Sequence, residues 1–209
     1  MSDIALSSML VKTHFVSTRL MRRKLAWLMI TVILLVGAGL VVKGSYMQLK
    51  AQLAQFLIAD SWQQSMLLQR PVKPWFYADT WPKAKLSFAQ YGIEQYVLSG
   101  ASGRNLAFGP AHLLSTHEFD ASGPSLIAGH NDTHFSFLKQ VAVGDEFELQ
   151  NQQGQVLKYR VSQIDVIHQS EDYFLYENSA KLYLMTCYPF NAIAAGTELR
   201  YLVTAEIVV

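Results

Sequence analysis

The sequence has very little cysteine and no excess of charge of either sign. Its 209 residues include one cysteine, Cys187, and 17 Lys and Arg residues stand against 16 Asp and Glu residues. A single cysteine cannot form an intramolecular disulfide and cannot by itself supply a cysteine-based zinc site. Nucleic-acid binding depends on a concentrated basic surface, which a net charge of +1 does not favour. We therefore expect no nucleic-acid partner, and a thiol that is either inert core filler or a nucleophile.

Charged residues are also missing from one long apolar run, residues 25–42 (LAWLMITVILLVGAGLVV), which lies between Lys24 and Lys43. As a helix with a rise of about 1.5 Å per residue, this run covers about 27 Å, close to the hydrocarbon thickness of a bilayer. Gly37 and Gly39 could imitate a signal-peptide cleavage site, but the run exceeds the usual apolar region of about 7–15 residues. The sequence predicts an uncleaved transmembrane helix over 25–42.

The flanking charges predict how this helix is oriented. Residues 19–24 (RLMRRK) are strongly basic, whereas only Lys43 and Lys50 follow the run closely. Because basic residues favour the cytoplasmic side, we expect residues 1–24 in the cytoplasm and everything after the run outside it.

A second helical pattern follows the apolar run. Apolar residues recur at 46, 49, 53, 56 and 57, and glutamines fill another side. Pro71 and Pro74 end the pattern because proline does not continue a helix. We predict a helical linker over 43–70, which is either a stalk or packs its apolar side on the following domain.

The pattern of the remaining residues, 71–209, predicts β structure. Short segments rich in β-branched and aromatic residues alternate with turn residues, a pattern typical of sheets. The candidate strands are 84–88, 94–99, 105–108, 125–128, 146–150, 156–168, 181–186 and 198–208. One all-β domain, a closed or nearly closed barrel, is the architecture that this pattern favours.

Two kinds of site find little support. The pair Gly100 and Gly103 lacks the βαβ context and the lysine of a phosphate-binding loop. The histidines near Asp132 match no zinc spacing, so we predict neither a metal nor a cofactor.

Three residues offer a different chemistry because each lies in or at the end of a strand-like run. Cys187 ends one run and is followed by Tyr188 and Pro189, which leaves regular strand pairing. His130 ends the run that starts at residue 125, and Arg200 lies within the last apolar run. A thiolate nucleophile, a proton donor to a leaving amine and a cationic donor for an oxyanion together fit acyl transfer through a thioester.

Each of these residues also has a structural alternative. Cys187 could be a small buried hydrophobe, as most lone cysteines are. Arg200 could pair with a carboxylate such as Glu198 or Glu206.

The same residues carry a resemblance to a known family. Residues 127–135 (IAGHNDTHF), then residues 184–187 (LMTC), then Arg200, behind an N-terminal anchor, resemble the sortase transpeptidases over about residues 75–209. Residues 76–82 (FYADTWP) resemble the subgroup of Gram-negative proteobacteria.

The resemblance implies a sortase-like eight-stranded β-barrel in which His130, Cys187 and Arg200 are catalytic. It implies cleavage of a Thr–Gly bond in a C-terminal sorting signal of the Leu-Pro-x-Thr-Gly type, and transfer of the acyl part from Cys187 to an amine or water. The partners would be a protein that bears this signal and an acceptor amine that the sequence does not identify. The protein would be a single-pass inner-membrane protein with a periplasmic catalytic domain.

Two supporting residues and two other functions remain open. Asp132 could orient the His130 loop or its imidazole, or be a solvated loop residue, and Thr186 could lend a hydroxyl or amide to the site or serve as an ordinary strand residue. An L,D-transpeptidase is one alternative, but its signature resembles Ser-x-Gly-Cys, whereas Met185 and Thr186 precede Cys187 here. The other alternative is a non-catalytic anchored β-domain that binds an envelope partner through Trp75 and Trp81.

Overall fold

The computed structural model describes residues 3–119, 123–176, 180–192 and 196–208, and it divides the chain into two compact units, Met1–Ala51 and Gln52–Val209. Helix α1 (Asp3–Leu68) forms the described part of the first unit. Its apolar run lies wholly exposed in the isolated chain, and the helix is long and apolar enough to cross a membrane. It therefore has the features of a membrane anchor or a signal.

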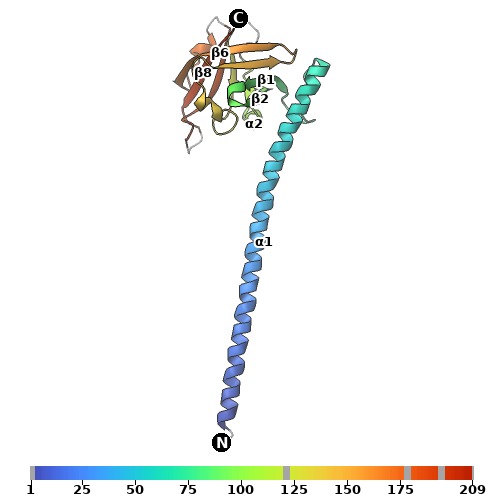
Figure 1. Ribbon diagram of the computed structural model, residues 1–209, viewed down its shortest axis with the longest axis vertical. Helices are drawn as coiled ribbons and strands as arrows, with labels where there is room; N and C mark the ends of the chain where they lie inside the picture. Colours follow the sequence, from blue (N-terminus) through green and yellow to red (C-terminus); the bar gives the residue numbers. More distant parts are fainter. Residues whose placement is uncertain (1–2, 120–122, 177–179, 193–195, 209) are drawn as a thin grey trace. The chain divides into compact units, whose positions relative to one another are not determined.

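The second unit is a closed eight-stranded β-barrel, which confirms the predicted all-β fold (Figure 1). The strands are β1 (Pro82–Phe88), β2 (Ile93–Ser99), β3 (Ala111–His112), β4 (Ser125–Ala128), β5 (Glu146–Asn151), β6 (Val156–His168), β7 (Lys181–Tyr188) and β8 (Leu199–Ile207). Their order around the barrel is β1-β2-β3-β4-β7-β8-β6-β5. The short helices are η1 (Ala89–Tyr91), α2 (Gly103–Leu106), η2 (Ser136–Gln140) and η3 (Tyr173–Tyr176).

Alternating burial along the strands fills the barrel. In β1, every second residue is buried, including Ala84, Leu86 and Phe88. These side chains belong to one core cluster with Ile127 and Leu184 from the other side of the barrel. Strands of this kind form because alternate side chains point to opposite faces of a sheet.

The structure corrects the predicted strand at 105–108. Residues 103–106 form α2 instead, because the Ser102 side chain accepts a hydrogen bond from the backbone N–H of Asn105, the usual cap of a helix N-terminus. The Asn105 amide also donates to the carbonyl of Gly100 at 2.8 Å. The third barrel strand is instead Ala111–His112, which is too short to give a sequence pattern.

The end of α1 that belongs to the second unit packs on the barrel and is not a free stalk. Ile58 is 1% exposed and clusters with Leu98 and Ala111. The Trp62 ring lies 6.1 Å from the Tyr96 ring, between centroids. The Gln55 amide donates to the carbonyl of Phe108 at 2.6 Å. Of the two alternatives considered for this segment, a stalk or a helix packed on the domain, the structure shows the packed helix.

Candidate active site

Strand pairing brings Cys187 and Arg200 together. Strands β7 and β8 are antiparallel, and Cys187 is the direct cross-strand partner of Arg200. Directly opposite residues on antiparallel strands have Cβ atoms about 4.5–5.5 Å apart. Cys187 is partly exposed, so its thiol is not a fully buried core group.

Three hydrogen bonds tie the His130 loop to β7 on both sides of Cys187. Strands β4 and β7 are parallel, so their carboxyl ends lie at the same edge of the barrel. The Gly129 N–H donates to the carbonyl of Met185 at 3.1 Å, and the Thr186 hydroxyl donates to the carbonyl of Gly129 at 2.7 Å. Beyond His130, the Asn131 amide donates to the carbonyl of Pro189 at 3.1 Å. The exposed imidazole of His130 is therefore carried on a loop that is fixed to the Cys187 strand.

Arg200 is held by neutral acceptors. Its Nη1 donates to the carbonyls of Thr197 and Leu199, and its Nη2 donates to Oε1 of Gln169 at 2.9 Å. Among the described residues, no carboxylate lies within 4.0 Å of the guanidinium. Glu198 instead lies 3.8 Å from Nε2 of His168, and Glu206 is paired across the sheet with Lys181, at the far end of β8. Neither carboxylate is the ion-pair partner considered for Arg200.

The two supporting residues differ in their surroundings. Thr186 is buried, and its hydroxyl links β7 to the residue before His130. Asp132 is exposed, and within the described chain no hydrogen bond or ion pair joins it to His130. Burial lowers the pKa of the nearby His134, and the negative charge of Asp132 opposes this effect only in part. The contacts of Thr186 thus give it a role in positioning the loop, and those of Asp132 do not.

Sequence reasoning did not find Asn131 and Gln169. Asn131 stands next to His130 in a polar loop, where an amide is ordinary. Gln169 follows β6 directly, and only the pairing of β6 with β8 brings it to Arg200. No local pattern marks a contact of this kind.

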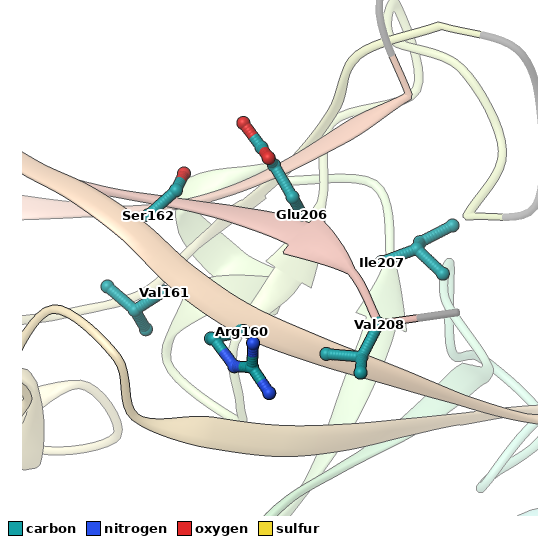
Figure 2. Close-up of a pocket in the computed structure, with 6 residues that line it drawn as sticks. All are labelled: Arg160, Val161, Ser162, Glu206, Ile207 and Val208. Carbon is teal, nitrogen blue, oxygen red and sulfur yellow. The ribbon is translucent and has the colours of Figure 1, made fainter.

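One surface pocket lined by described residues lies away from Arg200. This pocket of about 300 Å³ is lined by Arg160, Val161, Ser162, Glu206, Ile207 and Val208. These residues are drawn in Figure 2; they come from β6, from the end of β8 and from the residue just after it. This end of β8 is remote from Arg200. Across the described residues, no group of three or more His, Cys, Asp or Glu side chains could hold a metal ion, so we name no ligand set.

Comparison with known proteins assigns this barrel to a class. A model of the sortase domain matches residues 86–208. The chain therefore belongs to the sortase family, a family of cysteine transpeptidases that act on proteins.

Individual relatives agree with this assignment. Sortase D of Bacillus subtilis (strain 168) is 23% identical over 120 residues, which cover 56% of this chain and 60% of the length of that relative. Sortase C-1 of Actinomyces oris is 29% identical, with a TM-score of 0.55, over 61% of this chain and 74% of that one. A Clostridium perfringens sortase D5 shares the fold, with a TM-score of 0.60 and 18% identity, over 75% of this chain and 99% of that one.

Proposed function

We propose that this protein is a membrane-anchored cysteine transpeptidase that cleaves a C-terminal sorting signal of the Leu-Pro-x-Thr-Gly type. The observation that carries the proposal is the direct pairing of Cys187 with Arg200 at the barrel edge where hydrogen bonds fix the His130 loop. A nucleophile, a proton carrier and a cationic donor at one edge are the groups that acyl transfer needs.

The reaction proceeds in two steps. The Cys187 thiolate attacks the threonine carbonyl carbon, and the negative charge on the carbonyl oxygen is stabilised by N–H groups of Arg200. The C–N bond then breaks, and protonated His130 gives its proton to the leaving glycine amine, which leaves a thioester on Cys187. An amine or a water molecule attacks this thioester and gives a proton to His130, so that the thiolate is released and the histidine is again protonated.

The proposed location follows from α1 and from the sequence around it. The apolar run 25–42 anchors the protein in the inner membrane, and the basic segment 19–24 keeps residues 1–24 in the cytoplasm. Residues 43–70 are the helical linker and residues 71–209 the catalytic barrel in the periplasm. The likeness of residues 76–82 to the Gram-negative subgroup supports this compartment.

The test is to trap the covalent intermediate by mass spectrometry. The full chain in detergent is incubated with peptides that contain Leu-Pro-x-Thr-Gly and with variants of this motif. We expect an adduct with the mass of the peptide up to threonine. Because the chain has one cysteine, a thioester has only one place to form.

The control is Cys187→Ala, which removes the sulfur and changes little packing. This variant should form no adduct and cleave no peptide while it melts at the temperature of the unaltered protein. Peptide cleavage that persists in Cys187→Ala, or a complete lack of adducts across the panel, would contradict the proposed function.

A further inference from the structure

The third acceptor on the Arg200 guanidinium comes from outside the β7–β8 pair. Gln169 follows the last residue of β6, and its backbone N–H donates to the carbonyl of Glu198 at 2.7 Å. This bond continues the β6–β8 pairing, in which Ile167 faces Arg200. With its backbone held there, the Gln169 side chain meets Nη2 of Arg200 at 2.9 Å.

A count of donors shows what the three contacts leave free. A guanidinium has five N–H donors and no acceptor. Two donors of Nη1 are used by the carbonyls of Thr197 and Leu199, and one donor of Nη2 is used by Gln169. The N–H of Nε and one N–H of Nη2 have no acceptor among the described residues. Two donors therefore remain for a substrate oxygen.

The chemical type of the acceptor matters as much as its position. Glu171 and Glu198 are the acidic residues nearest to Gln169 and Arg200 in sequence, yet both interact with His168. Glu171 accepts a hydrogen bond from the His168 N–H at 2.9 Å, and Glu198 lies 3.8 Å from Nε2 of His168. Within the part of the chain that the structure describes, Arg200 is thus held by neutral oxygens only, and no carboxylate there offsets its positive charge.

We infer that Gln169 is the positioning residue for Arg200: its neutral Oε1 fixes the guanidinium without neutralising it, so that two N–H donors and the full charge act on the oxyanion and the Cys187 thiolate. This inference rests on the proposed function, because it assumes that Arg200 serves the Cys187 reaction. A carboxylate at position 169 would hold the guanidinium as well, but would partly cancel its field.

The inference distinguishes two substitutions. Gln169→Met keeps the length of the side chain and removes the acceptor, so kcat should fall about tenfold with little change in KM, because the guanidinium loses one of its three contacts. Gln169→Glu keeps an acceptor and adds a negative charge. It should lower kcat and should also move the pH profile of Cys187 alkylation to higher pH, because a nearby negative charge disfavours the thiolate.

The experiment uses the full chain in detergent and two readouts. Iodoacetamide alkylation of the single cysteine is followed against pH, which needs no peptide substrate, and kcat and KM are measured with the cleaved peptide. Gln163→Glu is the matched control, since Gln163 is an exposed glutamine on β6 whose amide contacts Asp165 and not Arg200. Among the described residues, the titratable groups next to Gln169, Arg200 and Cys187 or on the His130 loop are His130, Asp132, His168, Glu171, Tyr188, Glu198 and Tyr201, and all variants share them.

The outcomes distinguish failure of the proposed function from failure of the proposed role of Gln169. An unaltered protein that forms no adduct overturns the proposed function itself. An active protein that is impaired by Arg200→Ala, but whose Gln169 variants match Gln163→Glu in kcat and in the alkylation profile, overturns only the role of Gln169. Loss of activity in both Gln169 variants that merely follows a lower melting temperature would also overturn it, because Gln169 would then be structural.

Discussion

At the scale of single residues, the barrel holds histidines in opposite environments. His130 is exposed on its loop, whereas His112 is 0% exposed. Nε2 of His112 donates to the carbonyl of His117 at 3.0 Å, so Nδ1 accepts from the Lys83 ammonium, also at 3.0 Å. A second proton on His112 would face the Lys83 charge inside the barrel, and both burial and Lys83 lower its pKa. His112 is thus a buried group whose two ring nitrogens are both hydrogen-bonded, while His130 is exposed.

This environment makes stability depend on pH. Because the pKa of His112 is lower in the folded chain than in the unfolded one, the unfolded state binds more protons below about pH 6.5. The stabilising contribution is complete above that pH and is lost as the pH falls through the folded-state pKa. We expect the melting temperature to drop between pH 7.5 and 5, and His112→Gln to reduce this drop.

The matched control for this prediction is His168→Gln, since His168 is only partly buried. Part of the drop should remain in His112→Gln because the pKa of His134 is lowered as well. Identical pH slopes in the unaltered protein and in His112→Gln would show that His112 does not carry the effect.

Arg200 is a charged residue that forms no ion pair among the described residues. If it stabilises the oxyanion, Arg200→Ala should lower turnover by about 10²–10³, the usual cost of losing one such donor. Arg200→Lys keeps the charge but not the planar set of donors, so it should recover only part of the loss. Turnover and melting temperature are measured on the same samples. Equal losses of turnover and stability in both variants would reduce Arg200 to a structural residue.

At the scale of elements, the sequence predicted those strands whose residues alternate or form long apolar runs. The predicted bounds of β4 and β6 match the structure, and β1, β2, β5, β7 and β8 differ only at their ends. The strand predicted at 105–108 was wrong because the cap formed by Ser102 outweighs the apolar residues that follow. The sequence could suggest His130 and Cys187 from their positions at the ends of strand-like runs, and Arg200 from its position within the last apolar run. The contacts of Asn131 and Gln169 could not be foreseen, since they depend on cross-strand register.

The residue that follows β4, Gly129, has no room for a larger side chain. A Cβ atom at Gly129 would lie 2.7 Å from the ring of Phe135, which is fully buried. Gly129→Ala should therefore destabilise the fold by about 1–3 kcal/mol, as overpacking usually does. It should also lower turnover beyond this loss, because Gly129 bonds on both sides to β7 next to His130.

Gly103→Ala is the control for this variant, because a Cβ there meets nothing within 4 Å. Denaturant unfolding gives the free energy of unfolding for both variants. A Gly129→Ala variant as stable as Gly103→Ala would mean that Phe135 moves aside at no cost.

The last turns of α1 are part of the barrel unit by their packing. Ile58 is buried against Leu98 and Ala111, so Ile58→Ala should lower the free energy of unfolding by about 2–5 kcal/mol. Phe56→Ala, at a position of the same helix that is 68% exposed, should change it little. Equal effects of the two substitutions in urea unfolding would show that this helix does not dock on the barrel in solution.

At the scale of the whole molecule, the apolar part of α1 has the features of a membrane anchor or a signal. Residues 25–42 have no partner within the described chain that would bury them, and 18 residues of this kind suffice for a membrane span. If α1 is an anchor, its orientation decides which proteins the proposed enzyme can reach.

The basic segment 19–24 predicts the orientation, and reporter fusions test it. A reporter that is active only after export, fused after Val209, should be active, and a reporter that is active only in the cytoplasm should be silent at the same position. The fusion should stay at full length in the membrane fraction, because an uncleaved anchor is expected. Replacement of Arg22, Arg23 and Lys24 by glutamine leaves only Arg19 in this segment against Lys43 and Lys50, so it removes the charge bias and should weaken the orientation, whereas replacement of Lys43 and Lys50 should preserve it. A cytoplasmic reporter that is active after Val209 would place the barrel inside the cell, and a shortened soluble product would mean that the apolar run is a signal and not an anchor.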